Sequence, residues 1–259
     1  MPTVTSDDHS LAARLATEAG RLLIQLRANA TAGSDGPGGR LVGKALGREG
    51  DRQAHELLMA ALADARPDDA VLSEEGVADP SRLDAARVWI VDPLDGTREY
   101  GEVPRTDWAV HVALVVAGEP VAGAVALPAR DLTLGTQPAP AAPPVWEGAP
   151  RVVVSRSRPP AEATRVADAL GGELVPLGSA GAKAMAVVLG DADLYVHNGG
   201  QYEWDSAAPV AVARAAGLHA SRIDGSPLVY NRSDPYLPDL LVCRPELAEA
   251  AIAAAVAAG

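Results

Sequence analysis

The sequence predicts a mixed α/β fold built in two halves. Segments near residues 151–155, 173–176 and 192–196 read as strands and alternate with helical segments near 160–170 and 180–189, the pattern of a sheet covered by helices. The first half instead contains two strand-like segments, 108–114 and 121–127, around Gly118-Glu119-Pro120, which indicate an antiparallel hairpin. The stretch 137–150, rich in proline and alanine, is the clearest change of composition, so we place the boundary between the halves there.

Two helices are expected before the hairpin. Asp7 or Asp8 can cap the first, whose leucines form one apolar stripe at positions 11, 15, 22, 23 and 26. The second is expected from about residue 51 to residue 65. Between them, the glycine-rich stretch 31–40 has neither of the usual phosphate-binding glycine patterns, so we interpret it as a lid or a linker.

The segment Val88 to Tyr100, VWIVDPLDGTREY, carries the strongest chemical signal. Its first four residues read as a buried strand, and Pro93, which has no N–H to donate, is expected to end the ladder directly after Asp92. Asp95 follows in a tight turn, and a helix is predicted to start at Gly96-Thr97. Two carboxylates and the N–H groups of a helix start should therefore share one corner.

Carboxylates repel phosphate. This corner therefore suits an anionic substrate only if hard divalent cations such as Mg²⁺ lie between the carboxylates and the phosphate. The segment 69–75 is predicted as a strand ending in Glu74 and Glu75, one of which can face the corner. Asp205 precedes an apolar helix predicted over 206–216. The alternative interpretation gives these aspartates ordinary structural roles as helix caps and turn residues.

Composition excludes several classes of function. The net charge of −12 argues against a nucleic-acid duplex or an anionic membrane as the main partner, because both need a basic face. Cys243 is the only cysteine, so neither an intrachain disulfide nor a cysteine zinc site can form. His111, within the hairpin, is interpreted as a packed sheet residue. No apolar run reaches the roughly 18 residues of a membrane span, so we expect a soluble, cytoplasmic protein.

Three motifs together resemble a known family. SEE at 73–75, DPLDGT at 92–97 and EWDSAA at 203–208 occur in the order and spacing of the magnesium-dependent, lithium-sensitive phosphomonoesterases of the inositol monophosphatase superfamily. The similarity spans the whole chain. VLSEE, SRSR and GSAGAKAMAVVLGDADLY resemble most closely the CysQ-type 3′(2′),5′-bisphosphate nucleotidases of actinobacteria.

The resemblance implies a fold and an organisation. The fold is an α-β-α-β-α sandwich of the sugar-phosphatase type, an α/β architecture in which the site lies between two subdomains. Residues 1–140 would form an N-terminal α+β subdomain with most of the metal ligands. Residues 141–259 would form a C-terminal α/β subdomain with Asp205 and the substrate-binding residues. Members of this superfamily are often homodimers, so a homodimer is also an expectation.

The resemblance also implies a cofactor, two or three Mg²⁺ ions, and inhibition by Li⁺. The expected metal ligands are the side chains of Glu74, Asp92, Asp95 and Asp205 and the carbonyl of Leu94. Three residues are expected to activate the attacking water: Glu74, Thr97 and Asp51. The sequence before Asp51 reads GREGD, which is shorter than the family's usual loop and lacks its threonine.

The substrate implied is a small phosphorylated molecule. The residues expected to bind it are Gly96, Thr97, Ser155, Arg156, Arg158, Ser179, Lys183 and Asp205. Only Lys44 and Lys183 are lysines among the 22 basic residues, so a retained lysine is a candidate for chemistry. Arg158 replaces a histidine of the nucleotidase pattern, and His197-Asn198 stands where many members have an arginine.

The expected reaction is hydrolysis of the 3′-phosphate of adenosine 3′,5′-bisphosphate to AMP and phosphate, and of the related phosphosulfate. Two alternatives stay open. One is a phosphatase of the same superfamily that acts on inositol 1-phosphate or fructose 1,6-bisphosphate. The other is a metal-binding regulatory or structural protein without turnover.

Overall fold

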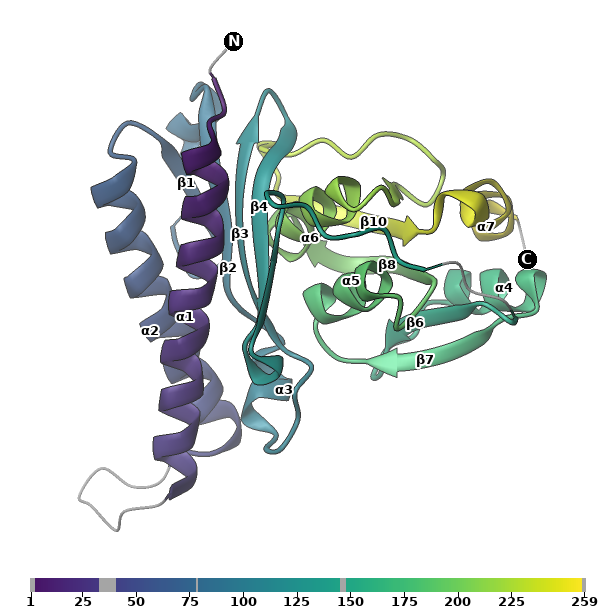
Figure 1. Cartoon of the computed structure of the whole chain (residues 1–259), viewed down its shortest axis with the longest axis horizontal. Helices are drawn as coiled ribbons and strands as arrows, with labels where there is room; N and C mark the ends of the chain where they lie inside the picture. The colour runs from purple at the N-terminus through teal and green to yellow at the C-terminus, as the bar shows by residue number, and fades with distance from the viewer. Residues whose placement is uncertain (1–2, 33–40, 78, 145–147, 258–259) are drawn as a thin grey trace.

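The computed structural model describes residues 3–32, 41–77, 79–144 and 148–257, and these residues form five layers (Figure 1). Two long helices cover the outer face of a first sheet, two more helices lie between this sheet and a second, and two helices cover the far side of the second sheet. This α-β-α-β-α order confirms the predicted fold class. In the order of the layers, the helices are α1 (Ser6–Ala32), α2 (Gly43–Ala65), α5 (Ala180–Leu189), α6 (Glu203–Ala215), α4 (Ala161–Leu170) and α7 (Ala248–Val256).

The first sheet has the strand order β1-β2-β3-β4-β5. β1 and β2 are parallel, and the other neighbours are antiparallel, so β3 and β4 form the predicted hairpin. A short helix, α3 (Thr97–Gly101), follows β2. The strands are β1 (Ala70–Ser73), β2 (Arg87–Asp95), β3 (Ala109–Val116), β4 (Glu119–Leu127) and β5 (Leu132–Gly135).

The second sheet has the strand order β7-β6-β8-β10-β9, in which β6 is parallel to both of its neighbours. β5 ends at Gly135 and β6 begins at Arg151, so the change from the first sheet to the second falls where composition placed the boundary. The assignment of each half as a subdomain stays a prediction. The strands are β6 (Arg151–Ser155), β7 (Glu173–Leu177), β8 (Leu194–Tyr202), β9 (His219–Ser221) and β10 (Tyr236–Cys243), and the short 3-10 turns are η1 (Pro80–Leu83), η2 (Pro128–Arg130) and η3 (Pro245–Leu247).

Three apolar clusters hold the layers together. The first, around Trp89, packs α1 and α2 on the first sheet; the second, around Met185, fills the space between the sheets; the third, around Val166, packs α4 and α7 on the second sheet. Successive residues of β3 alternate between the first and second clusters because side chains of a strand point to opposite faces. Val110 and Val112 therefore belong to the outer cluster, and His111 points into the interior between the sheets.

β2 continues past the proline that was expected to end it. The strand runs to Asp95, and its register with β3 shifts between Asp92, opposite His111, and Asp95, opposite Ala109. Pro93 is accommodated in this bulge, where no ladder hydrogen bond is required of it. The prediction that Pro93 ends the ladder was wrong, and the bulge brings both aspartates to the same end of the strand.

α2 begins at Gly43, so the segment GREGD is helical and is not a loop before the helix. The expectation of a start near Asp51 was therefore wrong. Gly47 and Gly50 are tolerated in this helix because it packs closely on its neighbours. A Cβ on Gly47 would lie 2.6 Å from Thr97 Cγ2, and one on Gly50 would lie 2.9 Å from the Tyr100 ring. The two glycines thus set the approach of α2 to α3.

Other boundaries shift by a few residues. β1 ends at Ser73, so Glu74 and Glu75 lie in the turn that follows and not in the strand. α6 begins at Glu203 instead of Ser206. Of the glycine-rich stretch interpreted as a lid or a linker, residues 33–40 lie outside the described residues. Among the helices of the described residues, none has the length and apolar content needed to cross a membrane.

Candidate active site

Three aspartates from both halves of the chain meet at one corner of the molecule. Asp92 and Asp95 lie at the end of β2, and Asp205 lies in the first turn of α6. Each offers one carboxylate oxygen, and these three oxygens lie within 4.8 Å of one another. Asp92 is 1% exposed and Asp95 is 6% exposed. The structure therefore brings together three of the predicted metal ligands.

The corner is electrostatically unfavourable without a cation. Burial and the charges of Glu74, Asp95 and Asp205 raise the pKa of Asp92 well above its ordinary value. Burial and the charge of Asp95 raise the pKa of Asp205 to about 7. A divalent cation would offset this repulsion, and a set of oxygen donors suits a hard ion. The residues present therefore fit a metal site of this class.

Asp95 is the exception because the start of α5 surrounds its carboxylate with donors. Ser179 Oγ donates to Asp95 Oδ2 at 2.5 Å, and the N–H groups of Ala180 and Gly181 donate to Oδ1 and Oδ2 at 3.0 Å and 2.6 Å. His111 Nε2 lies 3.2 Å from Oδ2. Burial alone would raise the pKa of Asp95, but the interaction with His111, the Ser179 hydroxyl and the charge of Lys183 hold it at about 2.

Thr97 joins the corner to α2. Its hydroxyl lies 3.2 Å from the carbonyl oxygen of Leu94 and 3.5 Å from Asp51 Oδ1. Gly96, which precedes it, has φ +85°, and a Cβ there would lie 3.1 Å from Ser179 Cβ. A left-handed conformation at this close approach favours glycine. The predicted residues Leu94, Gly96 and Thr97 thus lie next to Asp95, where β2 ends and α3 begins.

Two further acids surround the turn. Burial and the charge of Glu75 raise the pKa of Asp51 to about 7, although a hydrogen bond with Thr97 opposes the shift. Glu74 is an exposed residue, but its carboxyl group lies near those of Asp51, Asp92 and Asp95. Desolvation and the charges of Asp51 and Asp95 raise the pKa of Glu74 to about 7 against a hydrogen bond with Asp92. The predicted proton acceptors therefore lie at the same corner.

Lys183 lies in the first turn of α5 and is only 5% exposed. Its Nζ donates to the carbonyl oxygens of Gly178 and Ser179 at 3.0 Å and 2.6 Å and lies 5.2 Å from the centre of the Tyr195 ring. Burial lowers the pKa of Lys183, and the charges of Asp95 and Asp205 oppose that shift. The lysine therefore holds the turn that presents Ser179 to Asp95.

The two arginines of the SRSR segment have different surroundings. Arg156 pairs with Glu99 at 2.6 Å and with Glu102 at 2.7 Å, so its guanidinium joins the second half to α3. Arg158 is exposed. Its backbone N–H donates to Ser155 Oγ at 3.3 Å. The structure thus places Ser155 at the end of β6 and Arg158 in the exposed segment just after it, and Arg156 is engaged with carboxylates.

Sequence reasoning gave His111 no role in the site. The structure places its Nε2 beside Asp95 and its Nδ1 3.0 Å from the carbonyl oxygen of Trp204, directly before Asp205. Burial opposes protonation of His111, but the interactions with Asp95 and the Trp204 carbonyl raise its pKa. A polar residue in the middle of an otherwise apolar strand was the available signal, because a buried polar group needs a partner.

Comparison with known proteins agrees with this geometry. The model of the inositol monophosphatase family matches residues 8–141 and 148–259. The chain is 53% identical over 253 residues to the 3′-phosphoadenosine 5′-phosphate phosphatase of Mycobacterium leprae, covering 93% of this chain and 90% of that relative. It is 34% identical over 206 residues to the 3′(2′),5′-bisphosphate nucleotidase CysQ of Escherichia coli, covering 72% of this chain and 80% of that relative.

Solved structures show the same fold. Inositol monophosphatase II from Staphylococcus aureus matches with a TM-score of 0.77 at 20% sequence identity, covering 95% of this chain and 91% of that chain. Together with the family model, which matches nearly the whole sequence, these similarities explain why the three motifs converge on one corner. The chain belongs to the inositol monophosphatase family.

Proposed function

We propose that this chain is a phosphomonoesterase that removes the 3′-phosphate of 3′-phosphoadenosine 5′-phosphate, giving AMP and phosphate. The identity of 53% over 93% of the chain with a mycobacterial phosphatase of that name carries the proposal. The convergence of Asp92, Asp95 and Asp205 supports it, because phosphoryl transfer depends on positioning and on stabilising charge around the phosphate.

The cofactor proposed is Mg²⁺, with two or three ions held by the carboxylates of Glu74, Asp92, Asp95 and Asp205 and the carbonyl of Leu94. When bound, such ions lower the pKa of a water and stabilise the charge of the transferring phosphoryl group. Most of these acids lie so close together that deprotonating all of them without a cation is costly, as the raised pKa values of Asp92 and Asp205 indicate. Li⁺ is expected to compete for this site and inhibit.

Thr97, Asp51 and Glu74 are proposed to receive the proton of the attacking water. The Thr97 hydroxyl can donate to Leu94 or to Asp51 and still accept a hydrogen bond from a water with its lone pairs. Burial and the charge of Glu75 raise the pKa of Asp51 to about 7, so this carboxyl can take up and release a proton near neutral pH.

The remaining residues are proposed to bind the substrate. The N–H groups of Gly96 and Thr97 would hold oxygens of the reacting phosphate. Ser155, at the end of β6, and Arg158, which is exposed just beyond it, would meet the second phosphate, which suits the fork of donors on arginine. Lys183 would contribute its charge and hold the Ser179 turn in place, since its Nζ is already bonded to two carbonyl oxygens.

The test is phosphate release from the purified protein with Mg²⁺. We expect kcat/KM for 3′-phosphoadenosine 5′-phosphate to exceed that for inositol 1-phosphate and for fructose 1,6-bisphosphate. Comparable or faster turnover of the two sugar phosphates would refute the nucleotide preference and favour the alternative within the family. No release from any of the three would refute the phosphatase assignment.

Asp92→Asn tests the metal ligands, because it removes a charge and keeps the shape of a residue that is nearly fully buried. We expect kcat/KM to fall by more than roughly a hundredfold. Asp191→Asn is the matched control, since Asp191 pairs with Arg130 on the surface and its side chain is 54% exposed. Unchanged activity of the Asp92 variant would remove Asp92 from the site.

A further inference from the structure

His111 is a fully buried histidine whose two ring nitrogens both face oxygen atoms. It is 0% exposed, with Nε2 3.2 Å from Asp95 Oδ2 and Nδ1 3.0 Å from the Trp204 carbonyl oxygen. A buried polar ring without partners would be costly. Nδ1 is within hydrogen-bond distance of the Trp204 carbonyl, and Nε2, which makes no well-aligned hydrogen bond, is within ion-pair distance of Asp95. His111 thereby contacts Asp95 and also Trp204, the residue directly before Asp205.

The contact partners of His111 come from different elements. Asp95 ends β2, Trp204 belongs to the first turn of α6, and His111 itself lies in β3 opposite Asp92. The first turn of α6 also orients Asp205, whose Oδ2 accepts the N–H of Tyr202 at 2.7 Å. One imidazole therefore spans the gap between the strand that supplies two aspartates and the helix that supplies the third.

Gly181, in the first turn of α5, leaves the space that the imidazole occupies. A Cβ on Gly181 would lie 2.0 Å from His111 Nε2 and 3.0 Å from its Cε1. At other positions in a helix, alanine would be preferred to glycine by about 1 kcal/mol. The N–H of Gly181 also donates to Asp95 Oδ2, at 2.6 Å, so the glycine and the histidine approach the same carboxylate oxygen.

We propose that His111 is a positioning residue that fixes Asp95 and the first turn of α6 in the arrangement that binds the divalent cation, with Gly181 as its steric counterpart. The inference rests on the cation site of the proposed function. His111 would affect the cation indirectly, by holding Asp95 and the backbone of α6 in place. If the imidazole is removed, Asp95 keeps the hydrogen bonds from α5. The Trp204 carbonyl loses its contact with His111, so the first turn of α6, which carries Asp205, is held less firmly.

The test is Mn²⁺ binding, measured by the electron paramagnetic resonance signal of the free ion, with thermal unfolding of the metal-free protein recorded beside it. We expect His111→Ala to raise the Kd for Mn²⁺ by roughly ten- to a hundredfold. His111→Gln can still donate to Asp95 and should give an intermediate Kd. Val115→Ala is the matched control, because Val115 is buried in the same cluster between the sheets, further along β3. It should lower stability and leave the Kd unchanged.

Gly181→Ala provides an independent arm that keeps the imidazole. Alone, it should weaken Mn²⁺ binding about as much as His111→Ala, because the new methyl displaces the ring from Asp95. Combined with His111→Ala, it should add no further loss, since the ring that it would strike is gone.

Two results would overturn the proposal. If His111→Ala loses thermal stability as Val115→Ala does but binds Mn²⁺ like the unmodified protein, His111 is a packing residue. If the losses from Gly181→Ala and His111→Ala simply add, the two residues do not act through one contact. If the unmodified protein binds no Mn²⁺, the proposed cation site itself fails and the inference with it, a result distinct from both others.

Discussion

Asp92 and Asp95 lie three residues apart in the same strand, yet their pKa values shift in opposite directions. Asp92 is surrounded by carboxylates, and burial leaves it few ways to stabilise a charge, so its pKa rises. Asp95 is equally deep in the molecule, but N–H groups of α5, the Ser179 hydroxyl and His111 stabilise its charged form. The partners supplied by the tertiary structure decide which carboxylate is charged.

The first prediction concerns the acids whose pKa is raised. Asp51, Glu74 and Asp205 have folded pKa values near 7, against about 4 when unfolded. Between about pH 4 and pH 7 the folded state therefore binds more protons than the unfolded state. The stability that these groups contribute at low pH is lost as the pH rises through this range. The metal-free protein should unfold several degrees lower at about pH 8 than at about pH 5.5.

Excess MgCl₂ should cancel most of this loss, since a ligand that binds only the folded state stabilises it. Thermal unfolding with a chelator and with MgCl₂ at both pH values measures the two effects. A metal-free protein that becomes more stable as the pH rises over this range would contradict the prediction.

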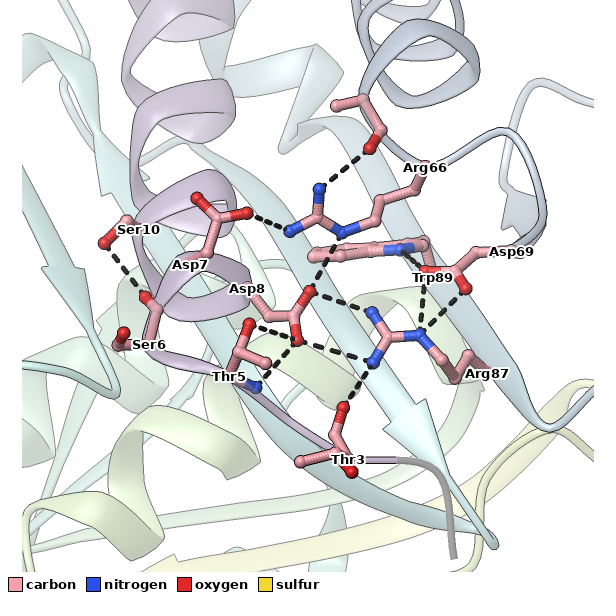
Figure 2. Close-up of polar contacts among 11 residues, drawn as sticks. Thr3, Thr5, Ser6, Asp7, Asp8, Ser10, Arg66, Asp69, Arg87 and Trp89 are labelled. Atoms are coloured by element: carbon pink, nitrogen blue, oxygen red, sulfur yellow. Dashed lines mark hydrogen bonds and ion pairs between the residues drawn. The ribbon is translucent and has the colours of Figure 1, made fainter.

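At the scale of elements, an ion network ties the start of α1 to the end of α2 and the start of β2 (Figure 2). Asp8 accepts the N–H of Thr5 at 2.9 Å, Arg66 Nε at 3.0 Å and an Arg87 guanidinium N–H at 2.8 Å. Arg87 also donates to Asp69. The sequence indicated a capping aspartate, but Asp8 lies inside the first turn and bonds back to the residue before the helix, as in a capping box.

The second prediction compares the two aspartates of this network. The Asp8 side chain is 2% exposed and that of Asp7, which pairs with Arg66, is 75% exposed. Asp8→Asn should lower the free energy of unfolding by about 1–3 kcal/mol, because it removes the buried charge that Arg66 and Arg87 share, although Asp7 and Asp69 still pair with these arginines. Asp7→Asn should change it by less than about 0.5 kcal/mol. Urea unfolding measures both, and equal effects would show that burial of Asp8 does not matter.

At the scale of the whole molecule, contacts between distant segments hold the two sheets at the corner. The start of α5 is bonded to Asp95 of β2. Arg82 of η1 donates to Asn231 Oδ1 at 2.5 Å and to the Arg232 carbonyl oxygen at 2.7 Å. Arg156 joins the second half to α3 through Glu99 and Glu102. The site therefore depends on the relative position of the halves.

The third prediction separates the two arginines of the SRSR segment. Arg156→Ala should lower the free energy of unfolding by about 1–3 kcal/mol, since it leaves Glu99 partly buried without its ion pair. Arg158→Ala should leave stability unchanged and raise the KM for 3′-phosphoadenosine 5′-phosphate roughly tenfold, by loss of a phosphate contact. Urea unfolding and steady-state kinetics on both variants test this. A purely kinetic effect of Arg156→Ala would mean that it binds substrate instead.

Much of this architecture follows from local sequence signals. The β3-β4 hairpin and the alternation of strands and helices in the second half depend on periodicity and turn chemistry, which the chain carries in its own order. The convergence of DPLDGT with EWDSAA was expected only from the family resemblance. The errors were also local. Pro93 was expected to end β2 because a bulge cannot be read from one strand, and α2 was started too late because Gly47 and Gly50 are explained only by the close approach of α3.

The sequence by itself determined which residues could supply oxygen donors to a metal, because Asp92, Asp95 and Asp205 are carboxylates in a recognisable order. Only the tertiary structure decided that α5 stabilises the charge of Asp95, that Arg156 is engaged with Glu99, and that His111 spans β2 and α6. These roles arise between segments far apart in the chain. A side chain's partners and burial fix its charge and orientation, and both are properties of the folded molecule.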